Sequence, residues 1–472
     1  MLKLILNTQF MLDQKYHQRL QELKKTSTNS SINKKLANLE KILFLLGKNN
    51  NYQNPATMPS TNCILFEGKE IIKNMDLEDC VNNKFEEIAA ALFLNNDLDN
   101  IRSNQSLLNL SQKIINDFCS YRGNIFENAI AINPVTEEKT STNLFNTSFI
   151  RSFNTSFKYD FKEIQINNKS WNSLANASSE LFAKVLFHFT EIYRRKFCHI
   201  KIDYNKKFET FAELFYYRLK GKTCTQSDKN LINAWFICLI EHGFSNSVDA
   251  GIRVASAHEI TKRFKEEPLD ALFASIMGES HGGAMVHIIK NLDKIAEVLT
   301  STSNNLEHIK TSLDNILNNS KVIHGFGHRV YKELDGRVKV LLKYILEHPN
   351  SSSSPRLKAA KFLIEHVKKV PANVDLLNPV VGEILGIQDE ALIPLFGSIL
   401  VVSLYSYISK RVIEQNNRLL RDNHINDSKA IDNYIEKLFI EIENEIKNTI
   451  HISSEREKYE KSQKETVLMA KL

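Results

Sequence analysis

The sequence predicts an all-α fold, and three features of the chain support this prediction. From Ser179 onward, successive segments place apolar residues at three- and four-residue steps, which is the period of a helix face. Gly221 and Gly243 fall where such segments should end. Almost no segment alternates apolar and polar residues as a half-buried strand does. We therefore expect a mainly helical protein.

Composition indicates an ordinary globular chain. Its 472 residues, 42% hydrophobic and 25% charged, can bury a large core and suggest two or three domains of about 150 residues. The 61 basic and 55 acidic residues give a net charge of +6, which is too mild for a dedicated nucleic-acid surface. The six cysteines show no CxxC or other metal-ligand spacing, so we expect them to be reduced, with no bound metal.

Two apolar segments could be read as a targeting signal or as a membrane-spanning helix. The N-terminal MLKLILNTQFML lacks a small-residue cleavage site, and no Arg-rich transit peptide is visible, so we expect a cytoplasmic protein. Ala391 to Ile408 approaches the ~18 residues that span a bilayer. Because it contains Pro394, Gly397 and several serines, we interpret it as a buried core or dimer-interface helix.

The first third of the chain contains the least regular patterns. Residues 1–60 are rich in Asn, Lys, Ser and Thr, which predicts a poorly ordered or loosely helical lead-in. The sequence ILFEGKEII after Cys63 predicts a short strand pair, and KFEEIAAALFL predicts an amphipathic helix ending near Leu94. Residues 133–170 repeat N-T-S and S-F elements, which suggests a long loop or an inserted segment.

Helical patterns dominate the remainder. Pro349 and the run Ser351 to Ser354 interrupt them once. The apolar stripe in the tail from Ala430 to Ile450 needs burial, most simply against a sister subunit. The clearest helical segments read ELFAKVLFHFTEIYRR, FETFAELFYYRLKG, KNLINAWFICLIEHG and PRLKAAKFLIEHVKKV.

The stretch from Lys321 to Lys339 is the first that suggests an active site. It reads KVIHGFGHRVYKELDGRVK, with two histidines, two glycines in one turn and several cations. Gly325 and Gly327 allow backbone conformations that a side chain would forbid, so His328 can be presented on a tight turn. A histidine beside cations suits an anionic substrate with a carbonyl group to polarise.

Three further places combine a titratable residue with glycine or a helix breaker. They are GESHGGA, which contains His281, the sequence NVD, which ends at Asp375, and EHG, which contains His242. We interpret five other histidines as ordinary core or surface residues; these are His258, His287, His308, His348 and His366.

Taken together, GESHGGA, GFGHRVYKELDGR and NVD, in this order and at these separations, resemble the signatures of the citrate synthase family. The resemblance runs from about Cys63 to Arg421 and is strongest from Ile240 to Asp375. It implies a homodimer with a large and a small helical domain and the active site in the cleft between them. On this chain it suggests a large domain of residues 61–292 and 396–472 and a small domain of residues 293–395.

The resemblance also implies roles for particular residues. Asp375 would be the base that removes a proton from acetyl-CoA, and His281 would donate a hydrogen bond to the enolate oxygen. His328 would donate to the carbonyl of a 2-oxoacid. The substrate-binding residues would be His242, Arg337 and Arg421, the last one reaching into the partner's site. Acetyl-CoA would be a co-substrate, with no permanently bound cofactor.

Structural alternatives remain open for several of these residues. Asp375 could cap the helix that LLNPVVGEIL predicts. His324 and His328 could be a metal pair, although the glycines between them disfavour a regular helix. Arg337 could pair with a carboxylate on its own helix.

The chain departs from the family pattern at several positions. The family has an arginine about 25 residues beyond the catalytic aspartate, where this chain has Leu400. A buried carboxylate without its cation costs on the order of 3–5 kcal/mol, so Leu400 counts against oxaloacetate as an efficient substrate unless Lys410 or Arg411 substitutes. The sequences HGFSNS, NVDLLNP and GESHGG also differ from the family's HExNAS, NVDxxSG and GPxHGG.

We therefore expect an acyltransferase that condenses acetyl-CoA with oxaloacetate or a related 2-oxoacid, giving citrate and CoA by default. Two alternatives are a methylcitrate synthase and a relative that cleaves citryl-CoA. A third, from a different class, is a catalytically weakened paralogue that binds acyl-CoA or a protein. No nucleic acid or membrane partner is expected.

Overall fold

The structure is a computed structural model. It describes residues 63–66, 69–73, 75–98, 101–125, 148–241, 246–258, 260, 262–278, 281–301, 323–327, 334–367 and 370–415, together with parts of 16–39 and residues 436–447. These residues form two compact units. One contains residues 60–420, and the other combines the two ends of the chain, residues 1–59 and 421–472.

The larger unit begins with a small antiparallel sheet. Strands β1 (Cys63–Phe66), β2 (Lys69–Ile72) and β3 (Met75–Asp76) pair in that order, with Cys63 opposite Ile72. The short helix α3 (Leu77–Cys80) leads to α4 (Phe85–Leu94), which ends at Asn95 in a left-handed conformation. The predicted strand pair and the helix that ends at Leu94 are confirmed. The helix is not amphipathic, because every residue of α4 except Glu87 is buried.

One helix lies where a loop or insertion was expected. After η2 (Ile101–Ser103) and α5 (Gln105–Ser120), residues 148–160 form α7 (Ser148–Asp160). Phe149, Phe153 and Phe157 recur every fourth residue on α7 and are all buried. The surrounding Asn, Thr and Ser residues concealed this helical spacing. The loop interpretation is therefore wrong for 148–160, and residues 133–147 lie outside the described residues.

The central helices follow the sequence patterns closely. Strand β4 (Ile164–Gln165) pairs with β5 (Arg263–Phe264), and between them lie α8 (Trp171–Tyr193), η4 (Arg194–Cys198), α9 (Phe211–Lys220), α10 (Gln226–Ile240) and α11 (Asn246–Ser256). Thr210 and Thr225 cap α9 and α10 through their side chains. Gly221, with φ +68°, ends α9 as predicted.

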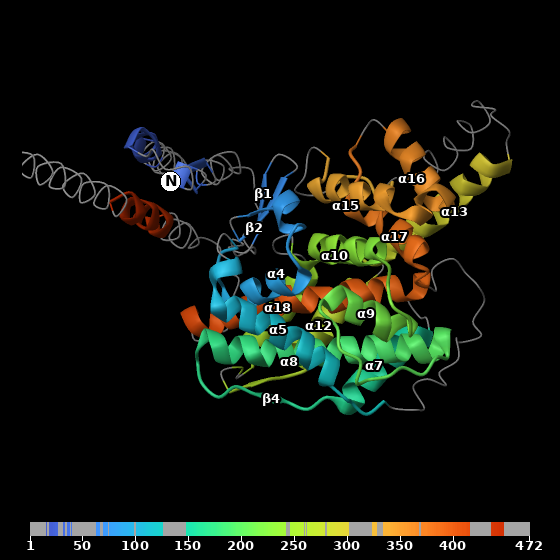
Figure 1. The fold of residues 1–472 in the computed structure, drawn as a ribbon, viewed down its shortest axis with the longest axis horizontal. Coiled ribbons are helices and arrows are strands. Elements are labelled where there is room, and N and C mark those ends of the chain that lie inside the picture. The colour runs from blue at the N-terminus through green and yellow to red at the C-terminus, as the bar shows by residue number, and fades with distance from the viewer. Residues whose placement is uncertain are drawn as a thin grey trace, which may run out of the picture. The chain divides into compact units, whose positions relative to one another are not determined.

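The last elements carry the candidate site. They are α12 (Glu267–Ile276), α13 (Gly283–Ser301), α15 (Gly336–Glu347), η5 (Pro349–Ser353), α16 (Pro355–His366), η6 (Val374–Leu376), α17 (Asn378–Leu385), η7 (Asp389–Ala391) and α18 (Leu392–Gln415). Figure 1 shows α18 among α4, α5 and α12, and it packs against α4, α8, α10, α11 and α12.

α18 contains the apolar segment that approaches membrane-spanning length. Residues Asp389–Glu414 are long and apolar enough to cross a membrane, but their most apolar window is entirely buried within the protein. The prediction of a buried core helix is therefore confirmed. The large antiparallel and parallel sheets of other fold classes are missing from the described residues, and the all-α prediction is also confirmed.

The smaller unit has its own hydrophobic cluster, formed by both ends of the chain. Tyr16, Leu20, Ile32, Leu36 and Leu39 pack with the tail residues Phe439, Ile442 and Ile446. Part of the tail's apolar stripe is thus covered by the N-terminal segment of the same chain, where we had expected a sister subunit. The N-terminal lead-in is helical at residues 18–26.

Candidate active site

The predicted glycine turn is present at residues 323–327. Gly325 and Gly327 have φ values of +86° and +74°, in the left-handed region that favours glycine. A Cβ atom at Gly325 would lie 3.1 Å from side-chain atoms of Leu376. The turn therefore needs glycine both for its backbone conformation and for its close approach to the Asp375 segment.

Backbone hydrogen bonds join this turn to the segment before Asp375. The Gly327 N–H donates to the Pro371 carbonyl at 2.7 Å, and the Asn373 N–H donates to the Gly325 carbonyl at 2.9 Å. The Asn373 side-chain amide also donates to the Gly327 carbonyl at 2.7 Å. Two motifs about 50 residues apart in the sequence thus form one local structure.

Asp375 lies within η6, before α17. Burial raises the pKa of its carboxyl group, while the nearby charges of Arg337 and His281 oppose the rise. The Asn378 side-chain amide lies 3.4 Å from Asp375 Oδ1 and itself accepts a 2.9 Å hydrogen bond from the Trp235 indole. The alternative of a helix cap is wrong, because Leu377 is the N-cap of α17.

His281 lies immediately before α13. Its Nδ1 atom is 3.0 Å from the hydroxyl oxygen of Ser247, a fully buried residue on α11. Burial lowers the pKa of His281, and the negative charge of Asp375 acts in the opposite direction. When the Ser247 hydroxyl donates to Nδ1, the neutral ring carries its proton on Nε2 and can donate it to a substrate oxygen.

Arg337 has the arrangement that the sequence left open as its alternative. Asp335 caps α15, and the Arg337 guanidinium donates to both of its carboxylate oxygens, with Nη2 to Oδ2 at 2.8 Å. The Val374 N–H also donates to Asp335 Oδ2, at 3.1 Å. This buried pair lowers the pKa of Asp335 despite its desolvation and anchors the residue before Asp375. The substrate-binding role of Arg337 stays a prediction.

Three predicted site residues lie outside the described residues, namely His242, His328 and Arg421. The proposed metal pair of His324 and His328 is also outside them, because it includes His328. Within the described ranges, no three His, Cys, Asp or Glu side chains are grouped as metal ligands.

Leu400 is 1% exposed and belongs to the main hydrophobic core. It lies on the same face of α18 as Ile393 and Gly397, since the three residues are spaced by four and three. Ile393 packs against Gly282, the residue after His281, and Gly397 packs against Phe273 and Ile276 at the end of α12. The described α18 surface nearest the His281 segment is therefore apolar.

Arg411, one of the two possible substitutes for the missing arginine, is 3% exposed, and burial lowers its pKa. Burial, and to a smaller extent the positive charge of nearby Lys410, lower the pKa of the Lys73 amine to about 7. Their approach to a bound acceptor stays a prediction.

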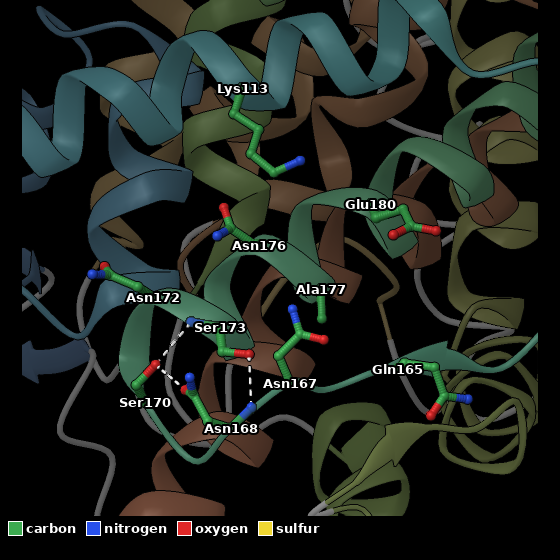
Figure 2. A pocket seen from close by; sticks show the side chains of 10 residues that line it. All are labelled: Lys113, Gln165, Asn167, Asn168, Ser170, Asn172, Ser173, Asn176, Ala177 and Glu180. Atoms are coloured by element: carbon green, nitrogen blue, oxygen red, sulfur yellow. Dashed lines mark hydrogen bonds between the residues drawn. The ribbon is translucent and has the colours of Figure 1, made fainter.

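A polar cavity of about 360 Å³ lies elsewhere in the larger unit, between α5, β4 and the start of α8. Figure 2 shows its side chains. The Ser170 hydroxyl donates a hydrogen bond to the Asn168 side-chain oxygen and accepts one from the Ser173 N–H. The charged residues in its lining, Lys113 and Glu180, pair with Asp117 and Lys184. No residue predicted for catalysis lines this cavity.

Sequence reasoning did not select Ser247, Asp335 or Asn378. Asp335 precedes Arg337 by two residues, and Ser247 lies within the HGFSNS sequence that overlaps the EHG motif. Proximity alone does not reveal which neighbour forms the hydrogen bond. Asn378 gave no signal beyond its place after Asp375.

The fold and the site define an all-α protein in which a half-buried aspartate with a raised pKa lies near a half-buried histidine with a lowered pKa, a pairing suited to acid–base chemistry. The chain belongs to the citrate synthase family, because the family described as "Citrate synthase, C-terminal domain" matches residues 56–423. Family membership supports an enzyme of the condensing transferase type.

The sequence is similar to known citrate synthases over part of their length. The chain is 30% identical to citrate synthase 2 of Bacillus subtilis over 217 residues, covering 44% of this chain and 54% of the relative. It is 26% identical to the citrate synthase of Saccharolobus solfataricus over 249 residues, covering 51% and 63%. The matches thus span about half the length of the first of these relatives.

Solved structures show the same fold. The citrate synthase of Thermoplasma acidophilum, in a ternary complex with carboxymethyl coenzyme A and oxaloacetate, matches with a TM-score of 0.59 at 20% identity, covering 77% of this chain and 91% of that one. The Thermotoga maritima enzyme matches with a TM-score of 0.57 at 21% identity, covering 77% and 90%.

Proposed function

We propose that the protein condenses acetyl-CoA with a 2-oxoacid. The observation that carries this proposal is the pair formed by Asp375 and His281, because the charge of each affects the other's pKa although 93 intervening residues separate them. Family membership supplies the reaction class.

In the first step, the Asp375 carboxylate accepts a proton from the thioester methyl group. Neutral His281 donates a hydrogen bond to the thioester oxygen, which stabilises the enolate that forms. The raised pKa of Asp375 makes its carboxylate a stronger base than an exposed aspartate, and the lowered pKa of His281 keeps the ring neutral.

In the second step, the enolate carbon attacks the keto carbon of the acceptor. We assign His328 as the donor to that keto oxygen, and His242, Arg337 and Arg421 as substrate-binding residues. Water then cleaves the thioester product and releases CoA. Oxaloacetate, which gives citrate, is the reference acceptor, and a homodimer in the cytoplasm is the expected assembly and location.

Leu400 favours a second candidate acceptor. A second carboxylate placed against buried apolar side chains would lack a cation partner on the described part of that surface, which carries Ile393, Gly397 and Leu400. An alkyl 2-oxoacid would not need such a partner. Methylcitrate formation, citryl-CoA cleavage and a weakened acyl-CoA-binding or protein-binding paralogue remain the other candidates.

Thiol release from acetyl-CoA, measured with a panel of 2-oxoacids, tests the proposal. We expect turnover with at least one acid, and we expect Asp375→Asn to lower kcat by about 10²–10⁴-fold, the usual contribution of a general base. Turnover with an alkyl acid but not oxaloacetate would support the altered acceptor. No turnover with any acid would contradict the proposed reaction and favour the binding paralogue.

A further inference from the structure

Two histidines outside the proposed chemistry stack against each other beside the candidate site. The rings of His287 and His324 have centroids 4.6 Å apart and an interplanar angle of 12°. Their faces are nearly parallel, which is a packing geometry for aromatic rings. Imidazoles that bind one metal ion instead direct nitrogen lone pairs to a common point.

The stack joins the two segments that carry the site. His287 lies on α13, six residues after His281, in the helix that begins at Gly283. His324 directly precedes Gly325, whose carbonyl accepts the hydrogen bond from the Asn373 N–H. A continuous set of contacts therefore runs from His281 through α13 and the stack to the glycine turn and Asp375.

The contact is favoured when the His324 ring is uncharged. Burial lowers the pKa of His324, and the charge of His287 lowers it further. The neutral ring is therefore favoured at neutral pH, and repulsion between two imidazolium rings is avoided.

We propose that His287 and His324 are positioning residues, whose stacked rings hold the glycine turn against α13 and so fix Asp375 relative to His281. The kinetic part of this inference rests on the proposed function. Neither ring is assigned a direct contact with substrate.

Single and double substitutions separate stacking from the individual side chains. His287→Ala and His324→Ala should each lower kcat by about two- to tenfold, the range expected for an aromatic pair. The kcat of the double variant should be no lower than that of the less active single variant, since either substitution removes the same contact. His324→Phe keeps an aromatic face and should retain at least half of the wild-type kcat.

A matched control exists on α16. The ring of His366 stacks on Phe362, with centroids 4.0 Å apart and an angle of 23°, in an exposed position. His366→Ala removes a comparable stacked pair outside the contacts described above, and its kcat should equal that of the wild type.

Trp235 provides a readout that does not depend on catalysis. Its indole donates to Asn378, which contacts Asp375, and the chain has two tryptophans. In a Trp171→Phe background, emission therefore reports the surroundings of Trp235 alone. His287→Ala and His324→Ala should shift this emission, whereas His324→Phe and His366→Ala should leave it unchanged.

The outcomes distinguish this inference from the proposed function. If the wild type releases no thiol but the emission shifts as expected, the proposed reaction fails and the positioning role stands. Unchanged emission in both alanine variants would overturn the positioning role, whatever the activity. Two kinetic results would show that ring stacking does not position the site. One is a double variant whose loss of kcat is the sum of the two single losses in free energy. The other is a His324→Phe variant whose kcat is as low as that of His324→Ala.

Discussion

Burial acts in opposite directions on Asp375 and His281, because it disfavours the charged form of each group. It raises the pKa of the carboxyl group and lowers that of the imidazole. The two shifts favour the combination that the proposed chemistry needs, namely a more basic carboxylate and a neutral hydrogen-bond donor.

The raised pKa of Asp375 predicts a pH-dependent effect on stability. The Asp375 carboxyl group binds its proton more tightly in the folded protein than in the unfolded chain. The stability that this provides is fully present below the ordinary pKa of 3.8 and is lost as the pH rises through the raised pKa of the folded protein. Asp375→Asn removes this loss. We expect it to raise the Tm by roughly 1–3 °C at pH 7.5.

Calorimetry at two pH values checks this prediction. The difference in Tm between Asp375→Asn and the wild type should shrink as the pH falls below 3.8, where the Asp375 carboxyl group is neutral in both the folded and the unfolded chain. A stabilisation of equal size at both pH values would show that packing of the amide, rather than the ionisation of Asp375, is responsible.

At the scale of secondary-structure elements, a buried polar cluster joins α7, α8 and the end of α5. His188 lies between the Ser156 hydroxyl and the Asp160 carboxylate, with both contacts at 3.1 Å. The Tyr121 hydroxyl donates to the same carboxylate at 2.6 Å. Although serine, histidine and aspartate meet here, Ser156 and His188 are 0% and 1% exposed, so a substrate cannot reach them and the cluster is structural.

Gly123 is predicted to be essential to this cluster. A Cβ atom at this position would lie 2.3 Å from Asp160 Oδ2 and 3.1 Å from His188 Nε2. We expect Gly123→Ala to lower the free energy of unfolding by about 1–3 kcal/mol through overpacking, measured by urea denaturation. Gly278→Ala is the control, because its nearest atom would be 3.4 Å away, and an equal loss there would refute the steric explanation.

At the scale of the whole molecule, the two ends of the chain form one compact unit with its own ion pairs. The Arg19 guanidinium contacts Glu436 and Glu443, each at 2.6 Å, and lies 4.6 Å from the centre of the Phe439 ring. Hydrogen bonds to these two carboxylates raise its pKa. Each end therefore stabilises the helical structure of the other.

Charge reversal tests this mutual stabilisation. Arg19→Glu would place three carboxylates together, and we expect limited proteolysis within the two ends to accelerate by roughly two- to tenfold. Adding Glu436→Arg and Glu443→Arg should restore resistance by reversing every pair. Lys437→Glu is the control, since Lys437 is 72% exposed and 3.9 Å from Glu441.

Cleavage rates decide between local and mutual stabilisation. If Arg19→Glu exposes the N-terminal segment but leaves residues 436–447 as resistant as in the wild type, the two ends fold independently. A triple variant that stays sensitive would indicate that the geometry of Arg19, rather than charge pairing, holds the unit together.

The sequence by itself determined the helical class, most central helices, the glycine turn and the buried character of α18. These features depend on local spacing of apolar residues and on glycine's backbone freedom, which neighbours along the chain specify. The motifs also predicted His281 and Asp375 as site residues, and the two lie near enough for the charge of each to affect the other's pKa.

Only the tertiary structure decided which partners these residues take. Arg337 had several possible carboxylates, and burial beside Asp335 selected one. His287 looked like an ordinary helical histidine until folding placed His324 against it. The tail's apolar stripe required burial, but its pattern did not specify the N-terminal segment as the cover. Local periodicity indicates that a face must be buried, whereas long-range packing determines what buries it.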